Sequence, residues 1–125
     1  MILGIGIDII EIERIVKVFS NKERKYMEKV FTPAEIEYSF SQKDPFLHLA
    51  ARFCAKEAYF KCFGDGVLIF NEIETRNGRN GKPYITLYGK TKQYWEEAGS
   101  PMIHVSLSHS KTVATAIVIL EERTV

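Results

Sequence analysis

The chain has 125 residues, of which 46% are hydrophobic and 26% are charged, a size and composition that fit one globular domain over residues 1–125. Its formal net charge of +1 lacks the basic excess that is typical of nucleic-acid-binding proteins, so we expect no nucleic-acid partner. No apolar run approaches the roughly 18 residues that cross a bilayer, and no signal peptide precedes the first predicted strand. We therefore expect no membrane partner and a cytoplasmic location.

The first predicted element is a buried strand over residues 1–10, an isoleucine-rich run with a single charge, Asp8. Because side chains alternate along a strand, Asp8 shares its face with Gly4 and Gly6. The opposite face carries Leu3, Ile5, Ile7 and Ile9. The two glycines are compatible with a bulge, with a close helix crossing, or with space cleared for a ligand beside Asp8, and the sequence leaves these alternatives open.

Short helices are predicted over residues 11–19 and 22–30. The segment from Arg14 to Lys29 has a local basic excess, which indicates either a solvated helix face or a surface for an acidic partner. The charged residues concerned are Arg14, Lys17, Lys22, Arg24, Lys25 and Lys29 against Glu23 and Glu28. A further helix begins at Thr32-Pro33-Ala34-Glu35, where the threonine is the cap and Glu35 completes a capping box, which is a sufficient structural role for this glutamate.

The longest predicted helix opens at Asp44-Pro45 and is closed by Gly64. With about 100° per residue, Glu57 falls near the centre of an apolar stripe formed by Phe46, Leu49, Ala50, Phe53 and Phe60. A carboxylate in a packed stripe must be neutral, hydrogen-bonded, ion-paired or bound to a metal. An i,i+4 pair with Lys61 is the purely structural explanation.

The same predicted helix also carries two lysines and two cysteines. Lys56 and Lys61 flank the Glu57 stripe, and their ordinary role is a buried stem with the ammonium in water, although a lysine beside a metal also suits a pyrophosphate. Cys54 and Cys62 are too far apart on one helix for a disulfide and lack metal-ligand spacing. We expect them to be reduced core thiols.

Asp8 and Glu57 are two carboxylates on otherwise apolar elements. This pattern resembles the oxygen ligands of a hard cation such as magnesium, which keeps several waters and usually shares the phosphates of a substrate. We therefore interpret Asp8 and Glu57 as a magnesium pair. That the two side chains meet in space is a hypothesis, since the sequence alone does not place them together.

The C-terminal half is predicted to contain strands over residues 70–76 and 84–88, a helix over 90–98, and a hairpin of strands 103–108 and 113–121. The whole order indicates a single α+β domain whose helices cover one face of a mostly antiparallel sheet.

The strand over residues 103–108 alternates apolar side chains with His104, Ser106 and Ser108. A solvated face and a functional site explain this alternation equally well. Nucleophilic serine catalysis is disfavoured, because Ser108 and His109 are adjacent on a strand and point oppositely, and no Gly-x-Ser-x-Gly elbow is present.

Five separated blocks of the chain stand in the order seen in a known family. They are Gly4-Ile-Gly-Ile-Asp8-Ile-Ile-Glu-Ile-Glu-Arg14-Ile, Phe31-Thr-Pro-Ala-Glu35-Ile, Arg52-Phe-Cys-Ala-Lys56-Glu57-Ala-Tyr-Phe-Lys61, Asn80-Gly-Lys-Pro83 and His104-Val-Ser-Leu-Ser-His-Ser110. Nearly end to end, the chain resembles the holo-acyl-carrier-protein synthases, the short, single-repeat form of the 4′-phosphopantetheinyl transferases. It departs from them at Cys54, where alanine is commoner, and at Gly64-Asp65-Gly66, which replaces a more usual Gly-Thr-Gly and adds negative charge near the expected coenzyme site.

The resemblance implies transfer of the 4′-phosphopantetheine group of coenzyme A to a serine of apo acyl carrier protein, with release of adenosine 3′,5′-bisphosphate. This is a magnesium-dependent phosphoryl transfer that belongs to fatty acid biosynthesis. The resemblance also implies that Asp8 and Glu57 hold Mg²⁺ and that Asp8, Glu57 and His104 are catalytic. The group that accepts the serine proton stays open between Glu57, His104 and a water molecule.

The resemblance further implies that Lys61, Gly64, His104 and Ser108 contact coenzyme A and that Arg14 contacts acidic residues of the carrier protein. It implies a homotrimer with sites between neighbouring subunits. Two other function classes stay open at this point: a different magnesium-dependent phosphoryl-transfer enzyme, and a non-catalytic module for acidic helical partners in which Glu57 merely pairs with Lys61.

Overall fold

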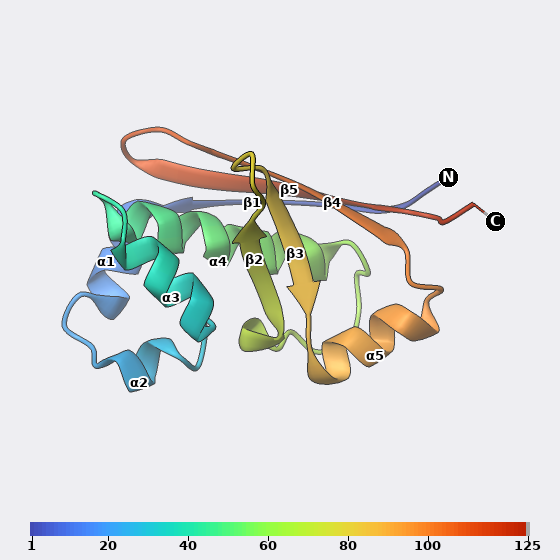
Figure 1. The fold of residues 1–125 in the computed structure, drawn as a ribbon, viewed down its shortest axis with the longest axis horizontal. Coiled ribbons are helices and arrows are strands. Elements are labelled where there is room, and N and C mark those ends of the chain that lie inside the picture. Colours follow the sequence, from blue (N-terminus) through green and yellow to red (C-terminus); the bar gives the residue numbers. More distant parts are fainter. Residues whose placement is uncertain (125) are drawn as a thin grey trace.

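The computed structural model describes residues 1–124 as two antiparallel sheets packed with helices (Figure 1). The larger sheet has the strand order β1-β5-β4, formed by β1 (Ile2–Glu11), β5 (Val113–Glu121) and β4 (Met102–His109). The smaller sheet is the hairpin of β2 (Ile73–Asn77) and β3 (Pro83–Leu87). The predicted α+β class and antiparallel pairing are confirmed, but the strands form two sheets, because β3 lies beside β4 without pairing with it.

The helices lie on one side of the three-stranded sheet, as predicted (Figure 1). They are α1 (Ile12–Phe19), α2 (Arg24–Met27), α3 (Pro33–Phe40), α4 (Pro45–Lys61) and α5 (Gly89–Glu97), together with a short 3-10 turn, η1 (Phe70–Glu72). Within residues 1–124, none of these helices combines the length and the apolar character that a membrane crossing requires.

The start of α3 is as predicted, whereas α2 is shorter than the helix expected over residues 22–30. At α3, the amide of Glu35 donates to Thr32 Oγ1 at 3.3 Å and the amide of Thr32 donates to Glu35 Oε1 at 3.0 Å, which is the capping box. In helix α2 only Met27 is buried, so the segment lacks the apolar face that would stabilise a longer helix.

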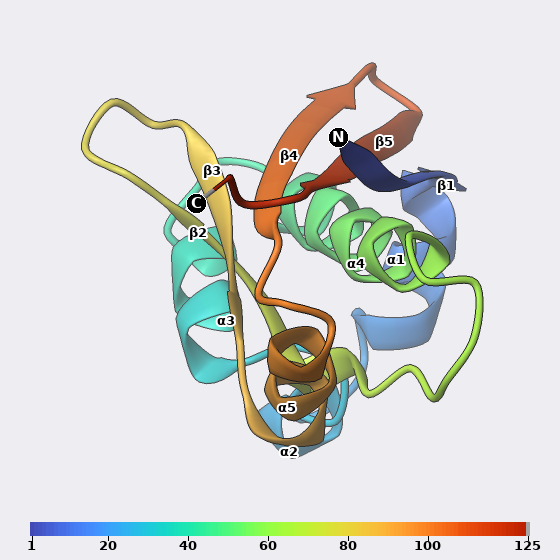
Figure 2. The ribbon, with the colours of Figure 1, turned by 90° about the vertical axis from the view of Figure 1, so that its right-hand side faces the viewer.

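Helix α4 crosses the three-stranded sheet at close range and forms the centre of the core (Figure 2). A Cβ atom on Gly4 or Gly6 of β1 would overlap the backbone carbonyl of Cys62 or of Ala58. Of the alternatives that the sequence leaves open for these glycines, the close helix crossing is the one found. The fully buried residues on α4 include Leu49, Ala50, Cys54, Ala55 and Ala58.

The stripe predicted around Glu57 is not the most buried side of α4. Leu49 and Ala50 are buried, but the phenylalanines of the stripe are only partly buried, and so is Glu57. The helix is covered by the sheet on one side and by α3 and β2 on another, so burial extends around much of its circumference. Glu57 lies at the less covered edge, where a carboxylate is accessible to solvent and to a ligand.

The expectation that Lys56 keeps its ammonium in water is wrong, because this side chain is fully buried. Its Nζ donates to Glu35 Oε1 at 2.7 Å and to the backbone carbonyls of Phe70 at 2.9 Å and Ile73 at 2.5 Å. The other carboxylate oxygen of Glu35 accepts from the amide of Thr75 at 2.9 Å. Burial lowers the pKa of Lys56, and the charge of Glu35 opposes this effect. The pair joins α4 to α3 and β2.

The same ammonium accounts for the late start of β2, which the sequence places at residue 70. Because Lys56 binds the carbonyls of both Phe70 and Ile73, the chain turns through η1 before it can extend. The amide of Glu72 donates to the carbonyl of Ile69 at 3.1 Å within this turn. The remaining strands and helices are found close to their predicted ends.

The outer face of the three-stranded sheet carries no helix in the described residues 1–124 (Figure 2). The exposed fractions on β1 are 46% for Leu3, 59% for Ile5, 61% for Ile7 and 65% for Ile9. The prediction of a strand buried on both faces is therefore wrong for the single chain, since only the Asp8 face is covered. Contiguous exposed apolar surface of this kind marks an interaction surface.

We expect Lys56→Met and Glu35→Gln each to lower the free energy of unfolding by about 3–5 kcal/mol, because each leaves one buried partner uncompensated. Urea unfolding followed by the fluorescence of Trp95, at one fixed protein concentration, measures the change. Lys17→Met is the matched control: Lys17 pairs with Glu13 at 3.6 Å on an exposed helix face, so its loss should cost less than about 0.5 kcal/mol. Equal effects for Lys56 and Lys17 would contradict the structural role of the buried pair.

Candidate active site

Asp8 lies on the inner face of β1, at the point where α4 crosses the sheet. Its register partner on β5, Ala116, is buried, and only 14% of the Asp8 side chain is exposed. From the last turn of α4, Lys61 Nζ lies 3.2 Å from Asp8 Oδ1 and donates to the carbonyl of Ile7 at 3.0 Å. The strand and the helix therefore bring two predicted site residues, Asp8 and Lys61, into direct contact.

Glu57 lies one helical turn before Lys61 and faces the same crossing. Lys61 pairs with Asp8, so an i,i+4 ion pair does not account for the position of Glu57. Partial burial raises the pKa of Glu57, the negative charge of Asp8 raises it further, and Lys61 and Arg14 act in the opposite direction. Asp8 and Glu57 are thus close enough to repel each other, as the hypothesis of a carboxylate pair requires.

Cys54 is a buried thiol under this pair. Its Sγ donates to the carbonyl of Ala114 at 3.4 Å. Burial raises its pKa to about 12, with a further contribution from the charge of Asp8. The thiol therefore stays protonated at neutral pH and is a poor nucleophile. Cys54 is a buried free thiol and Cys62 a partly buried one, so the expected core position holds for Cys54 alone.

The donor set of the pair fits a hard divalent cation. A cation held between two carboxylates that repel each other stabilises both of them in the charged form. One of these carboxylates lies on strand β1 and the other on helix α4. Within residues 1–124, no group of three or more His, Cys, Asp or Glu side chains is arranged to hold an ion. The further ligands would have to be water or substrate oxygens, which is typical of Mg²⁺. Asp8 and Glu57 are the residues that could hold it.

His104 and Ser108 lie on the other face of the same sheet. Ala116, the partner of Asp8, faces α4, whereas His104 and Ser108 alternate toward the outer face of β4. His104 Nε2 lies 2.9 Å from Glu121 Oε1 on the neighbouring strand β5. Within one chain, the structure does not bring His104 and Ser108 together with the carboxylate pair.

A groove of about 480 Å³ lies next to His104, between the β2–β3 turn and the outer face of the sheet. Its polar lining includes Asn80, Lys82, Tyr84, His104 and Ser106. Sequence reasoning gave no role to the first three of these residues. The available signal was the Asn80-Gly-Lys-Pro83 block, which the fold places opposite the His104 block.

Gly64 lies in the loop that follows α4. Its φ of +76° favours glycine, and no atom lies within 4 Å of the position that a Cβ would occupy. The backbone conformation alone thus explains the residue type. The carboxylate of Asp65 accepts a hydrogen bond from the hydroxyl of Tyr94 at 2.9 Å, so α5 engages the extra charge of this loop.

A sequence profile of the 4′-phosphopantetheinyl transferase superfamily matches residues 4–117. The chain belongs to this superfamily. The holo-[acyl-carrier-protein] synthase of Syntrophus aciditrophicus is 44% identical over 124 residues, with 97% of each chain covered. That of Ruminiclostridium cellulolyticum is 45% identical over 120 residues, with 93% of this chain and 90% of the relative covered.

Solved structures of phosphopantetheinyl transferases share the fold. The holo-(acyl-carrier-protein) synthase of Bacillus anthracis, in complex with CoA (3′,5′-ADP), has a TM-score of 0.79 and 38% identity, and the match covers 98% of this chain and 99% of that one. The Neisseria meningitidis synthase has a TM-score of 0.87 and 30% identity, with coverages of 98% and 100%. The resemblance read from the five sequence blocks is therefore confirmed.

We expect Glu57→Gln to melt at the same temperature as the wild type or higher at neutral pH. Because the folded state raises the pKa of Glu57, it binds this proton more tightly than the unfolded chain does. The wild-type free energy of unfolding then falls as the pH rises from about 4.3, the ordinary glutamate value, through the folded pKa, and the variant lacks this term. Melting curves over a pH series measure the difference.

Glu96→Gln, at an exposed position of α5, is the control and should leave the pH dependence unchanged. A Glu57→Gln variant that is clearly less stable than the wild type at neutral pH would show that ionised Glu57 stabilises the fold, against this reading of the site.

Proposed function

We propose that the protein transfers the 4′-phosphopantetheine group of coenzyme A to a serine of apo acyl carrier protein, releasing adenosine 3′,5′-bisphosphate, as a step of fatty acid biosynthesis. Support comes from membership of the superfamily, from relatives named holo-[acyl-carrier-protein] synthase, and from the coenzyme in the Bacillus anthracis structure. The observation in this chain that carries the proposal is the meeting of Asp8, Glu57 and Lys61 at the crossing of β1 and α4.

In the proposed reaction the carrier serine oxygen forms a bond to the β-phosphorus of coenzyme A, and the bond from that phosphorus to the bridging oxygen of the pyrophosphate breaks. Asp8 and Glu57 would hold Mg²⁺, which supplies neutralisation of pyrophosphate charge when bound. Lys61, whose Nζ lies 3.2 Å from Asp8 Oδ1, is positioned to share this charge. The raised pKa of Glu57 makes it a stronger proton acceptor than an ordinary glutamate, and His104 is the other candidate for accepting the serine proton.

The coenzyme is proposed to extend from this crossing into the groove beside His104. Lys82 and His104 can meet anionic phosphates there, and Ser106 and Asn80 offer neutral hydrogen bonds. The earlier assignments of Gly64 and Ser108 as coenzyme contacts stay part of the proposal. The groove lies on the outer face of the sheet and Asp8 on the inner face, so we propose that one coenzyme molecule bridges two copies of the chain.

A homotrimer with sites between neighbouring subunits satisfies this requirement. It would also cover the apolar outer face of β1, where Ile5, Ile7 and Ile9 are each more than half exposed in the single chain. The free thiols Cys54 and Cys62 fit a reducing compartment, so we propose a cytoplasmic location.

The carrier protein is proposed to dock on the basic segment that contains α1 and α2. Arg14 is exposed on α1 and near enough to Glu57 to lower its pKa, so it lies at the edge of the site. Arg24 already contacts Glu28 at 3.8 Å and Glu37 at 3.5 Å, which reduces its charge toward a partner. Arg14 is therefore the basic residue best placed for a carrier that enters the site.

The direct test is incubation with coenzyme A, Mg²⁺ and apo carrier protein, followed by the mass of the carrier. We expect the carrier to gain one phosphopantetheine group, and Asp8→Asn and Glu57→Gln each to slow the transfer by about 100-fold or more, because each removes an anionic oxygen at constant volume. Glu96→Gln should retain full activity. Cleavage of coenzyme A without a mass gain on the carrier would identify a different phosphoryl-transfer enzyme.

The same assay tests the shared site. Asp8→Asn and His104→Ala should each be nearly inactive alone, whereas co-expressed subunits of both kinds should recover about a quarter of wild-type activity, since about one interface in four then combines an intact Asp8 with an intact His104. A mixture as inactive as its components would place both residues in one subunit and contradict the shared site.

Arg14→Glu should raise the Michaelis constant for the carrier by about tenfold at low salt and leave that for coenzyme A nearly unchanged, because the exposed charge acts on the carrier alone. Added salt should bring the Michaelis constants of the variant and the wild type for the carrier closer together, since exposed charges are screened over a Debye length of about 10 Å at 0.1 M salt. Lys92→Glu, on exposed α5, is the control. Equal, salt-insensitive changes for both substrates, with a lowered melting temperature, would indicate a packing role instead.

A further inference from the structure

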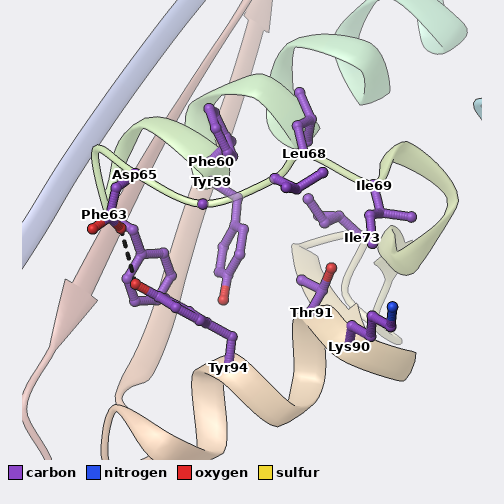
Figure 3. Close-up of a pocket in the computed structure, with 12 residues that line it drawn as sticks. Tyr59, Phe60, Phe63, Asp65, Leu68, Ile69, Ile73, Lys90, Thr91 and Tyr94 are labelled. Atoms are coloured by element: carbon purple, nitrogen blue, oxygen red, sulfur yellow. Dashed lines mark hydrogen bonds between the residues drawn. The ribbon is translucent and has the colours of Figure 1, made fainter.

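A separate cavity of about 160 Å³ lies between the end of α4, the loop over residues 64–69 and helix α5 (Figure 3). Its walls are mainly apolar and include Phe60, Phe63, Leu68, Ile69 and Ile73. An apolar cavity of about 150 Å³ is large enough to bind benzene. The cavity can therefore hold a molecule of that size.

One polar group on the cavity wall is unsatisfied. Tyr59 is 3% exposed, and its hydroxyl points toward α5 without a hydrogen-bond partner among the described residues (Figure 3). The neighbouring hydroxyls are engaged: Tyr94 donates to Asp65 Oδ1 at 2.9 Å, and Thr91 donates to Glu72 Oε1 at 2.8 Å. A buried polar group without a partner costs about 1–3 kcal/mol, so the Tyr59 hydroxyl gains from an acceptor in the cavity.

The charges around the cavity select against an ion. Asp65 is engaged by Tyr94, and Lys90 lies near the Glu72 carboxylate, whose pKa it helps to lower. A lone buried water is also poorly suited, because it needs about two to four polar partners and Tyr59 is the one buried side chain of the described wall whose polar atom lacks a partner. An apolar body with a single acceptor oxygen matches both the shape and the polarity.

We propose that this cavity binds a small neutral carbonyl compound of about benzene size, whose oxygen accepts a hydrogen bond from Tyr59. The molecule would lie under Leu68 and Ile69 and hold the loop over residues 64–69 in place. The loop has positive φ values of 76° at Gly64 and 94° at Gly66, and Val67 is 80% exposed on it, so few other contacts fix its position.

Occupancy of the cavity is coupled to coenzyme binding, because Gly64 at the start of this loop and Lys61 at the end of the preceding helix α4 are proposed coenzyme contacts. This coupling rests on the proposed function, whereas the binding of the carbonyl compound does not. By linkage, the factor by which coenzyme A changes the affinity of the compound equals the factor by which the compound changes the affinity of coenzyme A.

The test uses two probes of equal shape, cyclopentanone and methylenecyclopentane, which differ in the acceptor oxygen. Shifts of the methyl resonances of Leu68, Ile69 and Ile73 report binding. We expect Tyr59→Phe to lower the affinity for cyclopentanone by about two- to tenfold, because one hydrogen bond is lost, and to leave the affinity for methylenecyclopentane unchanged. Tyr38→Phe, which removes a hydroxyl from α3 outside the cavity, should change neither affinity.

Leu68→Trp fills the cavity from a partly buried loop position and should abolish binding of both probes while the protein stays folded by its melting curve. The proposal is overturned if neither probe shifts the cavity methyl resonances of the wild type, or if Tyr59→Phe weakens both probes equally. Cyclopentanone affinity measured with and without coenzyme A tests the coupling, and an unchanged value refutes it. Failure of coenzyme A itself to bind would instead count against the proposed function and leave the cavity result standing.

Discussion

The close crossing of α4 over β1 is the constraint on which the rest of the structure depends. Gly4 and Gly6 remove the side chains that would meet the carbonyls of Cys62 and Ala58, so the helix can approach the strand at backbone distance. Glycines at a crossing bury less apolar surface than larger side chains would, and each Å² of apolar surface that is not buried loses roughly 25 cal/mol of stabilisation. What the crossing gains is position: it brings the last turns of α4, with Glu57 and Lys61, against Asp8.

Two neighbouring residues of α4 have different roles: Lys56 stabilises the position of the helix, and Glu57 lies at the candidate active site. Lys56 and Glu57 are consecutive, so they project about 100° apart around the helix axis, one into the interior and one toward the edge of the sheet. The Lys56–Glu35 pair joins the helix to α3 and β2. The Lys56 ammonium has three acceptors, and it reaches all three in only one rotation of α4 about its axis. Buried ion pairs add little net stability relative to apolar packing. We infer that this pair specifies the rotation that directs Glu57 at Asp8.

Much of this arrangement could be predicted from the sequence, where local rules suffice. The period of two placed Asp8 on the glycine face of β1, and the Thr32 capping box fixed the start of α3, because both depend on neighbours in the chain. The buried state of Lys56 could not be predicted, since its three acceptors come from α3, from η1 and from the first residue of β2. The burial of the Glu57 stripe could not be predicted for a related reason. An apolar periodicity indicates the buried side of a helix that is covered on one side, whereas α4 is covered on several sides.

The candidate site was predicted unevenly for the same physical reason. Asp8, Glu57 and Lys61 are charged residues within otherwise apolar strand and helix patterns. A charge that interrupts such a pattern can be recognised from the sequence. Asn80, Lys82 and Tyr84 lie in a polar turn, where polar residues are ordinary, and only the packing of the β2–β3 turn beside His104 gives them a possible role. A polar residue on a polar segment carries no such signal until the fold supplies its neighbours.

The two faces of the three-stranded sheet link assembly to function. Strand alternation directs Asp8 inward and His104 outward, and no rearrangement short of a register change can put both on one face. The same alternation leaves Ile5, Ile7 and Ile9 uncovered on the outward face. In the proposed trimer, one contact between copies would bury these isoleucines and bring the outward groove of one chain to the carboxylate pair of the next. A small chain can in this way stabilise its assembly and complete its coenzyme site with the same surface.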